Sequence, residues 1–278
     1  MKRSWSPSLG IKASAVWHVG AVAALGTPIA WPWLLGGVLA NHAVLTAAGL
    51  WPRSTLLGRN LRTLSAAARD ARQIAITIDD GPDPDVTPAV LDLLDAGNAK
   101  ATFFCIGQAV QAHPVLAREI VRRGHRIENH SYAHRHHFSL MGMRQLRYEI
   151  STAQQTIADV TSTLPGYFRA PAGLRSPLLD PVLQSLDLTL VSWTRRGYDT
   201  VTRDPTKVLQ RLQSNLAAGD ILLLHDGHCA PDSQGVPVVL HVLPPLLRTL
   251  RTFDLNAVSL RDAARDTNDS KAGHHGKI

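Results

Sequence analysis

The chain alternates short apolar runs with amphipathic segments from residue 73 onward, and this alternation constrains its fold more than any other feature. The runs have the length of strands, and the segments between them have the length and spacing of helices. The runs cover residues 74–78, 101–106, 125–129, 166–170, 188–193, 220–225 and 254–259. The helix-like segments cover residues 87–96, 114–123, 143–160, 177–185, 205–216 and 237–250. Because strands and helices that alternate in this way form parallel sheets, the pattern predicts an α/β fold with a closed or nearly closed barrel.

Acidic and histidine side chains directly follow two of these runs. Asp79 and Asp80 follow the first run and precede a Gly-Pro pair, and His130 and His134 follow the third run. In parallel barrels, functional side chains lie at the carboxyl ends of strands, so we expect these residues to lie close together. Two histidines four residues apart would share one face of a helical turn and reach the same ion. Asp-Asp-Gly-Pro is also an ordinary turn sequence, and it is the histidine pair that favours a metal site.

One carboxylate and two imidazoles form a set of three ligands with a further position open for water. This is the arrangement of a catalytic zinc, in contrast to the closed sites of structural zinc. The remaining carboxylate would lie beside that water and act as a base. The sequence therefore predicts a metal-dependent hydrolase. Zinc is the metal we expect, although one aspartate and two histidines also suit cobalt, nickel or iron.

Three further segments carry polar side chains at the ends of later runs. Arg169 lies in Phe-Arg-Ala-Pro-Ala-Gly, Asp199 ends Trp-Thr-Arg-Arg-Gly-Tyr-Asp, and His225 lies in Leu-Leu-Leu-His-Asp. Taken singly, Arg169 is typical of a surface charge, Asp199 of a loop cap and His225 of a core histidine. In this order and spacing, the five segments together resemble the polysaccharide deacetylase family, the NodB-homology group of carbohydrate esterases. The resemblance covers roughly residues 73–262.

The resemblance implies a distorted (β/α)₇ barrel. It also implies an enzyme that uses a divalent metal to remove N-acetyl groups from sugars, or sometimes O-acetyl or N-formyl groups. Asp79 matches the family's catalytic base, and Asp80, His130 and His134 match its metal ligands. Arg169 matches the arginine that pairs with the base and keeps it ionised.

The resemblance also implies roles for residues around this centre. His225 matches the general acid, and Asp199 matches the carboxylate that orients it. Trp193 and Leu223 match residues that wall the acetyl pocket. The family usually carries a tyrosine where this chain has Ala172, and the backbone N–H of that residue helps to hold the tetrahedral oxyanion. Because the N–H survives the replacement, we expect catalysis to be retained and the wall that shapes the substrate site to differ.

Residues 13–52 contain no aspartate, glutamate, lysine or arginine. One membrane span needs about 20 apolar residues, so this stretch has the length of about two spans. Pro28 and Pro32 mark the expected turn between two helices, and Trp31 and Trp33 would lie at the level of the membrane interface. We therefore predict a hydrophobic helical hairpin in a membrane. The alternatives are a single anchor or a cleaved signal peptide, and a buried hairpin of a soluble protein.

The charges that flank this stretch predict its topology. Lys2, Arg3 and Lys12 precede it, and five arginines follow it between residues 53 and 72. Positive charge on both sides favours a membrane-associated hairpin with both ends, and hence the catalytic domain, on the cytoplasmic side. The chain then divides into a membrane-associated segment (1–52), a basic linker (53–72), a polysaccharide deacetylase domain (73–262) and a disordered tail (263–278).

The formal net charge of +7 bears on the partners of the chain. The basic residues are scattered and are not interleaved with aromatic residues, so we expect an anionic membrane or glycan, and no nucleic acid, as partner. An acylated carbohydrate is the expected substrate. The hairpin and the basic linker also suit a lipid-linked sugar that is deacylated or deformylated at the membrane. A glycan-binding pseudoenzyme is a third reading, although such proteins generally lose a metal ligand or the base, and all of these are present here.

Overall fold

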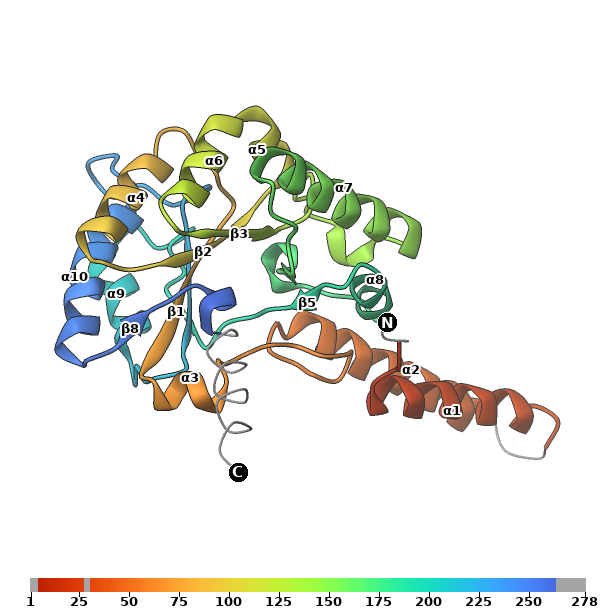
Figure 1. Ribbon diagram of the computed structural model, residues 1–278. Coiled ribbons are helices and arrows are strands. Elements are labelled where there is room, and N and C mark those ends of the chain that lie inside the picture. The colour runs from red at the N-terminus through yellow and green to blue at the C-terminus, as the bar shows by residue number, and fades with distance from the viewer. Residues whose placement is uncertain (1–4, 28–30, 264–278) are drawn as a thin grey trace, which may run out of the picture.

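The computed structural model describes residues 5–27 and 31–263, and the account below concerns these residues. The predicted disordered tail lies outside them except for Ala263, and so does Pro28 of the predicted turn. Within the described residues, the chain forms a parallel sheet covered by helices, and a pair of apolar helices extends away from it (Figure 1).

The sheet has eight strands, all paired in parallel. They are β1 (Gln73–Asp79), β2 (Ala101–Cys105), β3 (Arg126–Asn129), β4 (Tyr167–Phe168), β5 (Thr189–Leu190), β6 (Arg195–Arg196), β7 (Ile221–His225) and β8 (Asn256–Ala257). Their order is β5-β4-β3-β2-β1-β7-β6, and β8 pairs with β1 beside this path. The sheet curls into a half-barrel (Figure 1), which confirms the predicted α/β barrel fold.

Two features of the sheet differ from the prediction. β4, β5 and β8 are shorter than the apolar runs at 166–170, 188–193 and 254–259 suggest. β6 is missing from the prediction, because Arg195 and Arg196 have none of the apolar character that marks a strand in sequence. These two residues join the sheet through parallel backbone pairing with Leu222 and Leu223 of β7.

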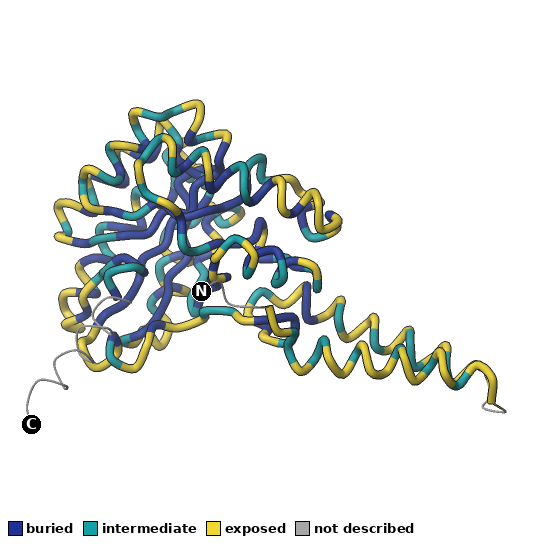
Figure 2. The backbone as a smooth tube through the Cα atoms, turned by 45° about the vertical axis from the view of Figure 1, so that its right-hand side comes forward, coloured by how far each residue is buried: buried dark blue, intermediate teal, exposed yellow. Residues whose placement is uncertain are grey.

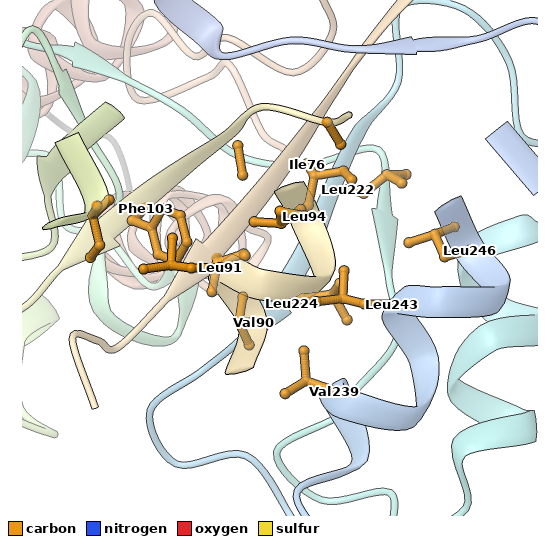
Figure 3. Packing of buried hydrophobic residues seen from close by; sticks show 14 of the residues in the cluster. Ile76, Val90, Leu91, Leu94, Phe103, Leu222, Leu224, Val239, Leu243 and Leu246 are labelled. Atoms are coloured by element: carbon orange, nitrogen blue, oxygen red, sulfur yellow. The ribbon is translucent and has the colours of Figure 1, made fainter. Parts of the chain in front are cut away.

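Helices cover the sheet from outside. They are α4 (Thr87–Ala96), α5 (Gly107–Ala112), α6 (Pro114–Arg122), α7 (Met143–Thr161), α8 (Leu179–Ser185), α9 (Pro205–Gln213) and α10 (Val238–Thr252). All but α5 correspond to the helix-like segments of the sequence. The main core lies between the sheet and helices α4 and α10, where Ile76, Phe103 and Leu224 of the sheet are fully buried near Leu94 and Leu243 (Figure 3).

Strand register brings the first and last motifs together. Every residue of β1 is buried, as is usual for a parallel strand covered on both faces. Its last residue, Asp79, lies opposite His225 of β7 and opposite Phe104 of β2. β3 ends at Asn129, directly before His130. The carboxyl ends of these strands therefore meet at one edge of the sheet.

The apolar stretch near the N-terminus forms two helices, α1 (Leu9–Ala24) and α2 (Trp31–Leu50), which pack against each other as a hairpin (Figures 1 and 2). Polar side chains face one another between them. Asn41 Nδ2 donates to Ser14 Oγ (2.9 Å), and His18 Nε2 lies 3.3 Å from His42 Nε2. Among the described residues, α2 alone is long and apolar enough to cross a membrane, with a mean hydropathy of 1.4. The helical hairpin is thus confirmed, and its insertion in a membrane remains a prediction.

Residues 53–72, which we expect as a basic linker, pack against the barrel instead. Leu57 and Leu64 are buried in this segment, and it contains a short helix, α3 (Ala66–Asp70). Leu61 forms a parallel bridge beside β5: its N–H donates to Leu190 O (2.8 Å), and its carbonyl accepts from Ser192 N (2.9 Å). Leucines spaced among arginines give no strand or helix period, so the sequence does not reveal this packing.

Candidate active site

The carboxyl ends of the strands open onto a cavity of about 810 Å³. The structure gathers the residues predicted for the active site at this cavity. Its lining includes Asp79, Asp80, His130, His134, Ala172, Trp193, Leu223 and His225. The other two predicted residues, Arg169 and Asp199, lie behind the lining and are 1% and 0% exposed.

Asp80, His130 and His134 form a candidate metal centre. One ligand atom from each lies within 4.8 Å of the others, and Asp80 Oδ1 is 3.2 Å from His130 Nε2 and 3.3 Å from His134 Nε2. Asp80 Oδ1 is buried and has no hydrogen-bond partner. His130 Nδ1 lies 2.8 Å from the carbonyl of Arg169, so Nδ1 carries the proton and Nε2 presents a lone pair to Asp80. Two acceptor atoms at this distance repel each other unless a cation lies between them, so the residues fit a divalent metal.

The protonation states of this group suit a metal ligand set. Burial lowers the pKa of His134 to about 4, so its ring is neutral at pH 7. Burial alone would raise the pKa of Asp80, but its contact with His228 helps to lower it below the usual range. A neutral imidazole and an ionised carboxylate are the forms that bind metal.

The loop that carries the two histidines is not the helical turn that their spacing predicts. β3 ends at Asn129, and the following residues form an irregular loop. Asn129 Oδ1 accepts from Ser131 N (2.9 Å), and Ser131 Oγ accepts from His134 N (3.1 Å). Ser131 and His134 have left-handed backbones, with φ of 65° and 45°. Local side-chain hydrogen bonds replace helical ones here, and they bring the rings of His130 and His134 to 4.9 Å between centroids.

Asp79 is paired with the buried Arg169. Arg169 Nη1 donates to Asp79 Oδ1 (2.6 Å) and to Thr77 Oγ1 (2.8 Å), and its guanidinium lies 4.2 Å from the centre of the Phe104 ring. The second oxygen, Asp79 Oδ2, lies 3.9 Å from His130 Nε2. Burial lowers the pKa of Arg169, and the charge of Asp79 opposes this effect. The pair therefore orients one carboxylate oxygen toward the candidate metal centre.

His225 is paired with the buried Asp199. His225 Nδ1 lies 2.9 Å from Asp199 Oδ1, and the backbone N–H of His225 donates to Asp199 Oδ2 (2.7 Å). Burial alone would lower the pKa of His225, but the charge and hydrogen bond of Asp199 raise it above its usual value. Because Nδ1 is bound by Asp199, Nε2 is the ring nitrogen left to act in the cavity.

Ala172, Trp193 and Leu223 all contribute to the wall of the cavity. Ala172 lies within a short 3₁₀ turn, Pro171–Gly173, with a left-handed backbone (φ 54°). Its methyl group is small, so the indole of Trp193 supplies the aromatic surface of this wall. The guanidinium of Arg196 lies 5.4 Å from the centre of the Trp193 ring.

The structure adds two residues that the sequence prediction lacks. His228 lines the cavity, and its Nδ1 lies 3.2 Å from Asp80 Oδ2. Asp226 is buried, and its carboxylate accepts from Thr87 Oγ1 (2.6 Å) and from Gly227 N (2.9 Å). Burial raises the pKa of Asp226 to about 7. In the sequence, the only feature that marks Asp226 and His228 as active-site residues is their position directly after the strand that ends at His225.

The sequence matches the family model described as polysaccharide deacetylase over residues 66–191. A chitooligosaccharide deacetylase of Azorhizobium caulinodans is 35% identical over 176 residues, which are 62% of this chain and 83% of that protein. A peptidoglycan-N-acetylglucosamine deacetylase of Bacillus cereus is 35% identical over 175 residues, which are 62% of this chain and 81% of that protein.

Solved structures show the same fold. A family 4 carbohydrate esterase from Streptomyces lividans, solved in complex with acetate, is 31% identical with a TM-score of 0.60, over 66% of this chain and 91% of its own. A family 4 pseudoenzyme from Bacillus anthracis has a TM-score of 0.65 over 73% of this chain and 68% of its own, and at 20% identity it supports the fold alone. The chain therefore belongs to the polysaccharide deacetylase family, and its two similar relatives are deacetylases, which are hydrolases of carbon–nitrogen bonds other than peptide bonds.

Proposed function

We propose that this chain is a metal-dependent deacetylase of N-acetylated sugars, with Asp80, His130 and His134 as the metal ligands. The observation that carries the proposal is the buried Asp80 Oδ1, which faces two imidazole nitrogens at 3.2 and 3.3 Å without a hydrogen-bond partner. A divalent ion held there would supply Lewis acidity toward the acetyl carbonyl and would lower the pKa of a water molecule to about 7. Zinc suits the ligands best, and cobalt or nickel also fits them.

Asp79 acts as the general base in this proposal. Its Oδ1 is held by Arg169 at 2.6 Å, and its Oδ2 faces the metal ligands, where it can accept the proton of the attacking water. The buried cation beside it favours the ionised form of the carboxylate, which a base needs near neutral pH.

His225 acts on the leaving amine, and the backbone of Ala172 acts on the oxyanion. His225 Nε2 donates a proton to the leaving amine, because an amide nitrogen departs only when protonated. General acid catalysis of this kind contributes about 10²–10⁴-fold to rate. The Ala172 N–H donates to the developing oxyanion, and losing one such donor typically costs about 2.7–4 kcal/mol. Trp193 and Leu223 enclose the acetyl methyl group.

The substrate class follows from the relatives. The two similar enzymes act on chitooligosaccharides and on peptidoglycan N-acetylglucosamine, so we propose a glycan that contains N-acetylglucosamine. A second candidate is a lipid-linked sugar at the membrane, which is favoured by α2 and by the exposed arginines that follow it, Arg53, Arg59 and Arg62. The hairpin would anchor the enzyme, with both of its ends on the cytoplasmic side.

The test uses the full chain purified in detergent. Bound metal is measured by elemental analysis, and acetate and formate release are measured on chitooligosaccharides, peptidoglycan and a lipid-linked acetylated sugar. We expect about one metal ion per chain and acetate release that a chelator abolishes. Metal without release from any substrate would favour a pseudoenzyme, and release from the lipid-linked sugar alone would favour the second candidate.

Three variants test the assigned roles. Asp80→Ala should lose both metal and activity, because it removes a ligand. Asp79→Asn and His225→Ala should keep the metal and remain folded, at a lower free energy of unfolding, but lose at least about 100-fold in kcat, because each removes a proton-transfer group. Full activity in Asp79→Asn or His225→Ala would refute that residue's role.

A further inference from the structure

Helix α2 ends against the loop that follows the Ala172 turn of the active site. Along α2 only Ala48 and Gly49 are buried, and both lie in its last turn (Figure 2 shows the exposed length of the hairpin and the burial at its base). The carbonyl of Gly49 accepts a hydrogen bond from Arg175 N (3.1 Å). Arg175 lies two residues after the Pro171–Gly173 turn that carries Ala172.

The contact between Gly49 and Arg175 leaves no room for a side chain. A Cβ atom at Gly49 would lie 2.3 Å from the carbonyl oxygen of Arg175. Arg175 is 6% exposed, and its Nη2 donates to the carbonyl of Ser54 (2.5 Å). The backbone carbonyls of Gly49 and Ser54, which lie before and after the end of α2, therefore hold Arg175 in place.

The same segment reaches the lining of the cavity through Pro52. A Cβ atom at Gly173 would lie 2.8 Å from Pro52 Cβ and 2.7 Å from Trp193 Cη2. Gly173 and Trp193 both line the cavity, and Gly173 has a left-handed backbone (φ 74°). Pro52 and the indole of Trp193 thus both pack against Gly173, and Pro52 itself does not line the cavity.

We propose that the end of α2, from Gly49 to Pro52, positions the Ala172–Arg175 loop and so places the Ala172 N–H for catalysis. Gly49 and Pro52 are positioning residues in this proposal, because they act through the loop and do not line the cavity. The hairpin is then a structural part of the active site as well as a candidate anchor. This inference rests on the proposed function, in which the Ala172 N–H holds the oxyanion.

The test compares two glycine substitutions in the same helix of the full chain. Gly49→Ala places a methyl group against the Arg175 carbonyl, so the loop has to shift. Gly36→Ala is the matched control, because a Cβ at Gly36 has no heavy atom within 4 Å. Acetate release is measured as kcat and KM, together with metal content and the midpoint of thermal unfolding.

We expect Gly49→Ala to lower kcat by about 10- to 100-fold, since a misplacement near 1 Å can cost 10²-fold. KM and metal content should stay close to the wild type, because the metal ligands lie on other loops. A general loss of stability would lower metal content as well. Gly36→Ala should behave as the wild type in all four measurements.

Wild-type kcat in a folded Gly49→Ala protein would overturn the inference, because the helix would then have moved without disturbing the loop. If Gly49→Ala does not fold, Pro52→Ala removes ring atoms behind Gly173 and should lower kcat several-fold, and unchanged kcat there would equally overturn it. Failure of the proposed function is distinguishable, because then the wild type and Gly36→Ala would also release no acetate.

Discussion

At the scale of single residues, the buried charges of the cavity wall occur in pairs. Arg169 pairs with Asp79, and Asp199 pairs with His225, and all four side chains are almost fully buried. Removing one partner of a buried pair leaves an uncompensated charge, which typically costs about 3–5 kcal/mol. The pairing therefore sets both the protonation and the orientation of the groups that we propose for proton transfer.

The pH dependence of activity should report the Asp199–His225 pair. Asp199 raises the pKa of His225, so the proton is held to higher pH and activity is lost as pH rises through that raised pKa. Asp199→Asn removes the negative charge, so the alkaline limb of kcat/KM should move to lower pH. The measurement is a pH–rate profile of both proteins at saturating metal, and an unmoved alkaline limb would show that His225 is not the acid.

His228 should strengthen metal binding by holding Asp80 Oδ2. A hydrogen bond on that oxygen leaves Oδ1 for the metal, and loss of such a contact typically costs 10–100-fold in affinity. His228 has a left-handed backbone (φ 55°), which glycine and asparagine tolerate. We expect His228→Gly to raise the zinc Kd about tenfold, measured by chelator competition, and His228→Asn, which keeps an N–H donor, to raise it much less. Equal affinity in all three proteins would contradict this role.

At the scale of elements, the connection between the hairpin and β1 belongs to the barrel. The segment 53–72 buries Leu57 and Leu64 and pairs with the chain beside β5, and the family model already matches from residue 66. A hydrophobic cluster joins Leu64 and Ala68 to Ala75 and Ile221 of the sheet. The catalytic unit therefore begins before the first long strand.

Leu64→Ala should lower the free energy of unfolding by about 2–5 kcal/mol, because it leaves a cavity in this cluster. The control is Leu140→Ala, where the leucine is 85% exposed and the change should be within about 0.5 kcal/mol. Urea unfolding of the full chain in detergent, followed by circular dichroism, measures both. Equal stability of the two variants would mean that residues 53–72 are only a connection.

At the scale of the whole molecule, the hairpin extends from the barrel (Figures 1 and 2). Large apolar side chains are exposed along its length. Val16, Val19, Trp33 and Leu39 are among them. Four polar side chains of the hairpin instead meet between α1 and α2, where Asn41 donates to Ser14 and His18 lies beside His42. Apolar groups outside and paired polar groups inside are what a lipid environment requires.

A charge on the outer face of α2 should therefore weaken membrane insertion. Leu39 lies near the middle of the helix and is 60% exposed. An arginine at the centre of a membrane helix costs about 2.5–3.5 kcal/mol for insertion, so Leu39→Arg should release much of the protein from the membrane fraction. Leu39→Ala is the control and should remain there after a carbonate wash. Identical fractionation of the two variants would argue against insertion of α2.

Much of the site follows from the sequence, because its chemistry is carried by residues next to strand ends. The strand and helix periods after residue 73 predict the barrel, and the barrel brings Asp79, His130 and His225 to one edge of the sheet. The uncharged stretch before residue 53 likewise predicts two helices. These properties depend on the hydrophobic period and on the identity of neighbouring residues. Both can be read directly from the sequence.

Other features depend on contacts between distant residues, and these only the tertiary structure decides. The loop from His130 to His134 is set by hydrogen bonds of Asn129 and Ser131 in place of a helical turn. The contact of His228 with Asp80 joins β7 to β1, and the packing of Pro52 against Gly173 joins the hairpin to the active-site wall. No local period encodes such contacts, because their energy comes from pairs of surfaces that meet only when the chain is folded.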